Sequence, residues 1–242
     1  MPKVGVRGVK LYYEELGEGP DILLMHGAMS TARRDFGSLI DGFAEHFHVV
    51  APDLRGFGRS QHVRSFEGNY YLEHARDMLA LIEALNLDEP HLVGFSDAGE
   101  FAFLMALEAP ERLRSIVASG VGGDLSPAFL TAVEEHYNGI AGEMMEIHGR
   151  TYWRRLLRAY LRAVEETARR YKDPLRRSEY HRIKKPVLII NGERDPYNPV
   201  GGAEALRDSL PYCDLWIVPG VGHTVKFEGF LERVRMFIDE HH

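Results

Sequence analysis

The chain has 242 residues, of which 45% are hydrophobic and 27% are charged, and its formal net charge is −7 at pH 7. This composition is typical of a globular protein, and an acidic balance without a long basic run excludes a typical nucleic-acid-binding protein. Apolar stretches reach only about seven residues, far fewer than the roughly twenty that cross a bilayer, so no membrane association is expected. The single cysteine, Cys213, excludes an internal disulfide, and the N-terminus lacks the apolar core of a signal peptide, which together favour a cytoplasmic location.

Strand-like and helix-like segments alternate along most of the chain. Residues 3–16 carry β-branched and aromatic residues around Arg7-Gly8, which predicts a β-hairpin. Short apolar runs then predict buried strands, and apolar residues spaced by three and four predict amphipathic helices between them. The predicted strands are 21–25, 48–53, 91–95, 114–120, 186–192 and 213–220, and the predicted helices are 33–46, 70–87, a helix ending at 109, 200–210 and 224–240. This repetition predicts an α/β fold with a mostly parallel central sheet and helices on both faces.

Residues 122–182 interrupt the alternation, because they contain no strand signal and two or three helices. In the helix predicted at about 150–171, the apolar residues form one stripe and arginines occupy the opposite face, which indicates packing against the sheet domain. The insertion lies between two core strands, so it is also a candidate lid. The predicted organisation is a core domain of residues 1–121 and 183–242 with a short helical cap at 122–182.

The stretch Gly94-Phe95-Ser96-Asp97-Ala98-Gly99 follows a predicted strand and opens a predicted helix. This context is that of a nucleophile elbow, in which small residues around a strained serine let the strand and the helix cross closely. The turn lifts the serine hydroxyl above the sheet, over the N-terminus of the next helix. Ser96 is therefore the candidate nucleophile.

A serine hydroxyl needs a base to take its proton, and the base needs an acid that fixes its tautomer. Among the twelve histidines, His223 directly follows the last predicted strand, where a loop reaches the ligand crevice of an α/β sheet. Asp195, in the loop after strand 186–192, is the favoured acid and gives the chain order serine, acid, histidine. Asp124, after the preceding strand, is the alternative acid.

Acyl transfer also needs two hydrogen-bond donors at the developing oxyanion. The candidates are the backbone N–H groups of Asp97, directly after the serine, and of Ala28, in the loop after the strand at 21–25. The candidate substrate-binding side chains are those of Asp97, Met29 and Trp153. No metal or cofactor is expected, because the histidines lack paired ligand spacing, one cysteine cannot form a thiolate site, and no dinucleotide fingerprint is present.

Five segments in order, LLMHGAMS, APDLRGFGRS, LVGFSDAGE, LIINGERDP and PGVGH, resemble the landmarks of the α/β-hydrolase superfamily and span nearly the whole chain. The resemblance implies a serine-type triad of Ser96, Asp195 and His223 beneath a helical cap. Ala98 stands where glycine is more usual, and we expect the elbow to tolerate its methyl group. The Ser-Asp pair of the elbow is similar to that of valacyclovirase-like (biphenyl-hydrolase-like) esterases, which cleave α-amino-acid esters.

Asp97 poses an electrostatic problem in this arrangement. A carboxylate at a helix start interacts favourably with the helix dipole, but it opposes an oxyanion held by its own N–H unless a lid arginine or a cationic substrate neutralises it. We expect a serine hydrolase that cleaves small carboxylic esters through an acyl-enzyme, with α-amino-acid esters as the finer hypothesis. Lactonase, C–C hydrolase and aminopeptidase chemistry stay open, as does a ligand receptor with slow or no turnover. A monomer or small homo-oligomer is expected.

Overall fold

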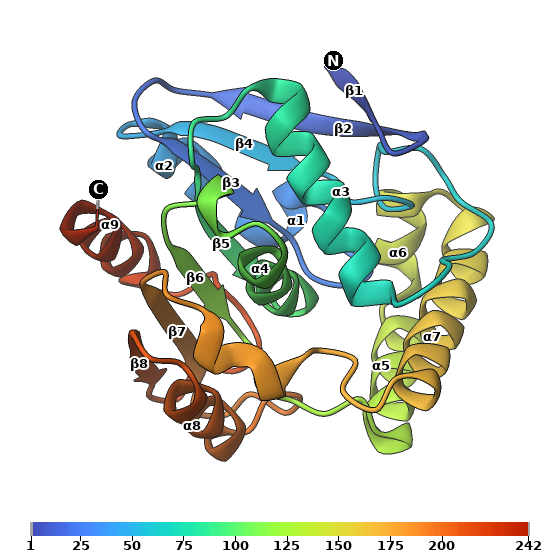
Figure 1. Cartoon of the computed structure of the whole chain (residues 1–242). Helices are drawn as coiled ribbons and strands as arrows, with labels where there is room; N and C mark the ends of the chain where they lie inside the picture. Colours follow the sequence, from blue (N-terminus) through green and yellow to red (C-terminus); the bar gives the residue numbers. More distant parts are fainter. Residues whose placement is uncertain (1, 242) are drawn as a thin grey trace.

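The computed structural model describes residues 2–241 and contains an eight-stranded sheet (Figure 1). The strand order is β1-β2-β4-β3-β5-β6-β7-β8. The strands are β1 (Lys3–Val6), β2 (Val9–Leu16), β3 (Asp21–Met25), β4 (His48–Pro52), β5 (His91–Phe95), β6 (Ile116–Ser119), β7 (Val187–Gly192) and β8 (Cys213–Val218). The β1–β2 and β2–β4 pairs are antiparallel, and the pairs from β4 to β8 are parallel. The predicted α/β fold is confirmed.

Helices cover both faces of the sheet. They are α1 (Ala32–Phe36), α2 (Leu39–Ala44), α3 (Tyr70–Leu85), α4 (Asp97–Glu108), α8 (Val200–Ser209) and α9 (Phe230–Glu240). Strand β3 shows how one strand serves two layers: Ile22 and Leu24 join the core under α1, α2 and α9, while Leu23 and Met25 join the core under α3, α4 and α8. All four side chains are buried, which explains why this strand is a continuous apolar run.

Two of the predicted helices have different limits in the structure. The helix predicted at 33–46 is two helices, because Gly37 takes a φ of 53° between α1 and α2. The last helix starts only after Gly229, whose φ is 87°. The residues before it form a turn in which Thr224 Oγ1 accepts the N–H of Lys226 at 3.0 Å. This turn replaces the predicted first turns of the helix and borders the site described below.

Residues 122–182 form helices α5 (Pro127–Gly139), α6 (Ala141–His148) and α7 (Tyr152–Arg170), followed by a 3₁₀ turn at Arg177–Arg182. The three helices lie together on one side of the molecule, next to α3 (Figure 1). The apolar stripe of α7 is buried and its arginines are exposed. The Thr167 hydroxyl accepts the N–H of Tyr70 at 3.0 Å and so joins α7 to the start of α3. Among residues 2–241, no helix combines the length and the apolar character needed to span a membrane.

Candidate active site

Ser96 occupies a strained turn between β5 and α4. Its φ of 57° and ψ of −124° lie outside the regions that L-residues favour, at a cost on the order of 1–3 kcal/mol. A Cβ at Gly94 would lie 2.3 Å from the Ala98 carbonyl oxygen, and a Cβ at Gly99 would lie 2.4 Å from Val121 Cγ1. Helix α4 therefore packs too closely against the end of β5 and against the chain after β6 for side chains at these two positions. This close packing leaves the turn no other conformation and so holds Ser96 in its strained backbone geometry.

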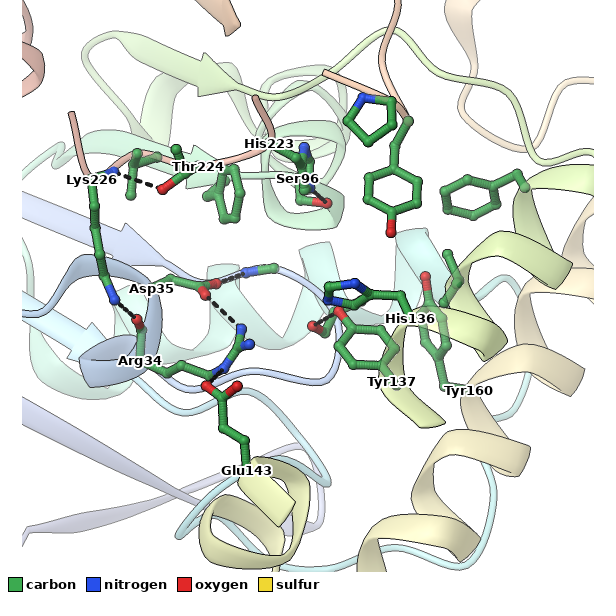
Figure 2. A pocket seen from close by; sticks show the side chains of 18 residues that line it. Arg34, Asp35, Ser96, His136, Tyr137, Glu143, Tyr160, His223, Thr224 and Lys226 are labelled. Carbon is green, nitrogen blue, oxygen red and sulfur yellow. Dashed lines mark hydrogen bonds and ion pairs between the residues drawn. The ribbon is translucent and has the colours of Figure 1, made fainter. Parts of the chain in front are cut away.

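Ser96, His223 and Asp195 form one hydrogen-bonded line. His223 Nε2 lies 3.1 Å from Ser96 Oγ (Figure 2), and His223 Nδ1 lies 2.6 Å from Asp195 Oδ2. The other carboxylate oxygen, Oδ1, accepts the backbone N–H groups of Tyr197 at 2.9 Å and Asn198 at 3.0 Å. An ionised carboxylate only accepts, so Nδ1 of the imidazole carries the proton and Nε2 faces the serine hydroxyl as an acceptor. This geometry suits transfer of the serine proton to the histidine.

The alternative acid does not reach the histidine. Asp124 is exposed, and its carboxylate accepts the backbone N–H of Ser126 at 3.1 Å. The end of β6 serves the site in another way, because Gly120 takes a φ of 65° and a Cβ there would lie 2.9 Å from Cε1 of His223. The backbone directly after β6 thus forms a wall against the imidazole, and the carboxylate that reaches the imidazole comes from the loop after β7.

The loop between β3 and α1, residues 26–31, passes directly beside the serine. A Cβ at Gly27 would lie 2.9 Å from Cβ of Ser96. Nε2 of the buried His26 accepts the Leu54 N–H at 2.9 Å, so Nδ1 carries the proton and donates to the Gly27 carbonyl at 2.7 Å. Burial lowers the pKa of His26, which keeps this neutral tautomer. Because the C=O and N–H of a trans peptide point in opposite directions, fixing the Gly27 carbonyl also fixes the direction of the Ala28 N–H.

Asp35 holds the same loop from the other side. It is 7% exposed, and its carboxylate accepts the Gly27 N–H at 2.8 Å and the Ser30 hydroxyl at 2.5 Å. The second candidate donor, the Asp97 N–H, is the first of α4, and the first N–H groups of a helix have no intrahelical partner. Both candidate oxyanion donors therefore belong to backbone that other groups hold in place.

A cavity of about 410 Å³ extends from Ser96 and His223 between the sheet and the inserted helices (Figure 2). This volume suits a small organic ligand. The inserted segment contributes residues from all three of its helices, namely Phe129, Val133, His136, Tyr137, Glu143 and Tyr160. Arg34 and Lys226 line the cavity far from the serine, and Arg34 Nε donates to Glu143 at 2.6 Å. These lining residues escaped the sequence analysis, since they lie in no motif and are identified only by their positions in space.

Two of the predicted substrate-binding residues are not in the cavity, and this part of the prediction was wrong. Met29 and Trp153 both have 0% exposure and belong to the hydrophobic core under α3 and α4. A side chain with no accessible surface cannot contact a ligand in this conformation. Trp153 lies in the apolar stripe of α7, which packs against the core, and the cavity instead receives Tyr160 from that helix.

Asp97 lies beside Ser96 in a recess of about 30 Å³, and Ser96 and Phe129 line both this recess and the larger cavity. The residue is 6% exposed, and Tyr71 Oη donates to its Oδ1 at 3.3 Å. Among residues 2–241 its Oδ2 has no hydrogen-bond partner, but the Tyr70 and Tyr160 hydroxyls lie near enough to interact with the carboxylate. Burial raises the pKa of Asp97 to about 7. The arginine of the inserted segment beside the recess, Arg177, donates instead to Glu100 at 2.6 Å. The sequence analysis expected a lid arginine or a cationic substrate to neutralise Asp97. Arg177 does not pair with the Asp97 carboxylate in this structure.

Comparison with known proteins identifies the family. Residues 20–167 match the family described as alpha/beta hydrolase fold, and the chain belongs to it. Residues 158–230 also match a family described as TAP-like protein.

Among curated proteins, the chain is 27% identical over 237 residues to serine hydrolase BPHL of Homo sapiens, covering 92% of this chain and 80% of that protein. It is 24% identical over 242 residues to a pimeloyl-[acyl-carrier protein] methyl ester esterase of Nitrosomonas europaea, covering 88% of this chain and 92% of that protein. The structure of a meta-cleavage product hydrolase from Pseudomonas fluorescens IP01 has a TM-score of 0.83 at 21% identity, covering 99% of this chain and 98% of that one. The chain is thus a hydrolase of the α/β-hydrolase type.

Proposed function

We propose that this protein is a serine esterase that cleaves small carboxylic esters through an acyl-enzyme. The observation that carries the proposal is the line from Asp195 through His223 to Ser96, with both hydrogen bonds at or below 3.1 Å. The cavity that begins at this line has the volume of a small-molecule site, and esterases occur among the curated relatives.

Each group has a defined step in this mechanism. Ser96 Oγ attacks the ester carbonyl carbon while its proton passes to His223 Nε2, and Asp195 stabilises the imidazolium. The backbone N–H groups of Ala28 and Asp97 hold the oxyanion. The carbonyl–alkoxy bond then breaks, and His223 protonates the leaving alcohol. Water attacks the acyl-enzyme with His223 as the base, and the proton returns to Ser96 as the carboxylic acid leaves.

A fluorophosphonate probe followed by an ester panel tests this proposal. We expect the probe to label wild-type protein at one serine, and we expect Ser96→Ala to abolish both labelling and hydrolysis of p-nitrophenyl esters. The Ser126→Ala variant is the control, because the Ser126 hydroxyl caps the N-terminus of α5 and takes no part in the hydrogen bonds that join Ser96, His223 and Asp195. Absence of labelling in the folded wild-type protein would favour the alternative that this chain is a ligand receptor with little or no turnover.

Other bond types are second candidates on the same groups. A structural neighbour that is 25% identical, Est816, is described as degrading N-acyl homoserine lactones, and the chain is 31% identical over 125 residues to a 2-hydroxy-6-oxo-6-phenylhexa-2,4-dienoate hydrolase of Burkholderia cepacia. Lactone and C–C substrates therefore belong in the same assay panel, together with aminopeptidase substrates. Faster turnover of one of these than of any ester would replace the esterase assignment and keep the serine mechanism.

The recess beside Ser96 supports a finer proposal, that the acyl group carries an ammonium near the carbonyl. Three carboxylates, Asp97, Glu100 and Asp124, line this recess against one arginine. The unpartnered Oδ2 of Asp97 can accept an ammonium N–H, and the recess volume is close to that of one small polar group. An α-ammonium lies two bonds from the reacting carbonyl carbon, so it reaches a recess that adjoins the nucleophile.

Asp97→Asn tests the ammonium proposal with paired substrates. Hydrolysis of an α-amino-acid ester should fall by at least about tenfold more than hydrolysis of a neutral ester of equal length, because only the first loses a charge partner. In the wild-type protein the preference for the amino ester should rise with pH up to about 7, where Asp97 ionises, and fall again as the substrate ammonium loses its proton at about pH 8. Equal losses for both esters in the variant would exclude the proposal and leave the esterase mechanism intact.

We also propose that residues 122–182 act as a cap over this site, since α5, α6 and α7 all contribute to the cavity wall. A cytoplasmic location is proposed on the basis of the single cysteine.

A further inference from the structure

Two cap side chains donate hydrogen bonds to consecutive carbonyls of the loop at residues 26–31. Tyr137 Oη, from α5, donates to the Ala28 carbonyl at 2.7 Å, and its ring lies at the cavity wall (Figure 2). His148, the last residue of α6, donates from Nε2 to the Met29 carbonyl at 3.1 Å. The donors are 109 and 119 residues from their acceptors in the sequence, so only the folded cap brings them to the loop.

The direction of the His148 bond is fixed by a second contact. Nδ1 accepts the backbone N–H of Gly58 at 3.1 Å, which leaves Nε2 as the protonated nitrogen. The side chain is 2% exposed, and burial lowers its pKa to about 4, so the imidazole is neutral near pH 7. His148 thus acts as a fixed donor between two core loops.

The loop needs such external support at this point. Met29 takes a φ of 49°, a left-handed conformation that a long side chain adopts only at an energetic cost. The core holds the residues on both sides, through His26 on the Gly27 carbonyl and Asp35 on Ser30. The carbonyls of Ala28 and Met29, which set the rotation between these supports, are held by the cap.

We propose that Tyr137 and His148 are positioning residues through which the cap helps His26 to hold the Ala28 N–H that receives the oxyanion. This inference rests on the proposed serine mechanism. The Ala28 N–H lies in the Gly27–Ala28 peptide, which His26 holds, and the Ala28 C=O lies in the next peptide, which Tyr137 holds. Because the two peptides join at the Ala28 Cα, release of the second peptide leaves His26 as the remaining side-chain support of the two and gives the donor more freedom to move. In this arrangement the cap therefore contributes to transition-state stabilisation as well as to the cavity wall.

The test compares Tyr137→Phe with Tyr152→Phe. Both variants remove a phenolic hydroxyl that ties the cap to the core, but Tyr152 Oη, from α7, donates to the Gly56 carbonyl at 2.9 Å, away from the loop beside Ser96. We expect Tyr137→Phe to lower kcat by about 10- to 100-fold with KM changed less than about threefold, a fraction of the effect of losing an oxyanion donor. We expect Tyr152→Phe to retain kcat within about threefold at a similar loss of thermal stability.

His148 allows a rescue experiment with the same readout. A glutamine can place an amide N–H near the position of Nε2, so His148→Gln should retain more kcat than His148→Leu when both are folded. The binding of a boronic acid, which forms a tetrahedral adduct on Ser96, should weaken in Tyr137→Phe by about the same factor as kcat falls. Equal kcat values for the Tyr137→Phe and Tyr152→Phe variants would overturn the inference.

Hydrogen exchange separates failure of this inference from failure of the esterase proposal. Amides of residues 27–30 should exchange faster in Tyr137→Phe than in wild type and should be unchanged in Tyr152→Phe. This readout needs no turnover. A wild-type protein that neither labels nor hydrolyses esters would end the esterase proposal, while unchanged exchange at 27–30 in Tyr137→Phe would end the inference about the loop.

Discussion

Replacement of Asp97 by asparagine should stabilise the protein, and the gain should increase with pH. The side chain is 6% exposed, and burial raises the pKa of this carboxyl from 3.8 to about 7. In the unfolded chain an aspartate titrates near its ordinary value of about 3.9. The folded protein therefore retains a proton over a pH range in which the unfolded chain has already lost it.

Proton linkage gives the sign and the size of the effect. Below about pH 4 both states carry the proton, and Asp97 imposes no penalty. Between about pH 4 and 7 the folded state binds more protons than the unfolded state, so the free energy of unfolding falls by about 1.4 kcal/mol per pH unit. Above about pH 7 the loss is complete at about 4 kcal/mol. Asparagine does not titrate and carries none of this pH-dependent loss.

Urea unfolding of the wild-type protein and Asp97→Asn at pH 5 and pH 8 measures this difference. Tyr71 can still donate to the asparagine oxygen, and any cost of burying the amide is the same at both pH values. We expect the advantage of the variant to be about 2.5 kcal/mol larger at pH 8 than at pH 5. Asp214→Asn, at an exposed position on β8, is the control and should show little change. An advantage that is equal at the two pH values would refute the reasoning.

Three further substitutions test the elbow, the proton line and a buried ion-pair cluster. Gly94→Ala should destabilise the fold by about 3 kcal/mol in urea unfolding, because its Cβ would lie 2.3 Å from the Ala98 carbonyl oxygen; a neutral effect would contradict the close crossing. Asp195→Asn should lower kcat by about 10³- to 10⁴-fold with little change in circular dichroism, because the imidazole loses its carboxylate partner; near-normal kcat would remove Asp195 from the mechanism. Asp77→Ala should lower the free energy of unfolding by about 2 kcal/mol, since the fully buried carboxylate forms ion pairs with Arg55 at 2.5 Å and Arg7 at 3.0 Å. A loss below about 0.5 kcal/mol would show that water solvates both arginines equally well in the variant.

The sequence was sufficient for the parts of the site that follow strands. Strand ends are marked by apolar runs, and parallel strands place the residues after them at one edge of the sheet. The positions of Ser96, Asp195 and His223 could therefore be inferred from their order and their distance from a strand. The same reasoning could not exclude Asp124 as the acid, because it also follows a strand. Only the structure shows that its carboxylate accepts the backbone N–H of Ser126.

The cavity-lining side chains of the inserted helices could not be predicted in this way. An apolar stripe shows that a helix is buried on one side, but it does not show which buried positions face a cavity and which face the core. Trp153 and Tyr160 lie on the same stripe of α7, yet only Tyr160 lines the cavity. The contacts of Tyr137 and His148 join segments more than a hundred residues apart and leave no local pattern. The spacing of apolar residues also could not predict the break at Gly37, because the buried residues of α1 and α2 continue the same pattern.

The phenol of Tyr137 belongs to α5, while the carbonyl that it binds belongs to the loop after β3. A cap that swings outward to admit a ligand takes the phenol with it and leaves that carbonyl without its donor. Under the proposed mechanism, such an outward position would admit the ligand, and only the position seen here would support the oxyanion loop from both sides. An ester too bulky to leave α5 in this position would be held near the serine and cleaved slowly, so the hydrogen bond of Tyr137 to the loop would select against large substrates.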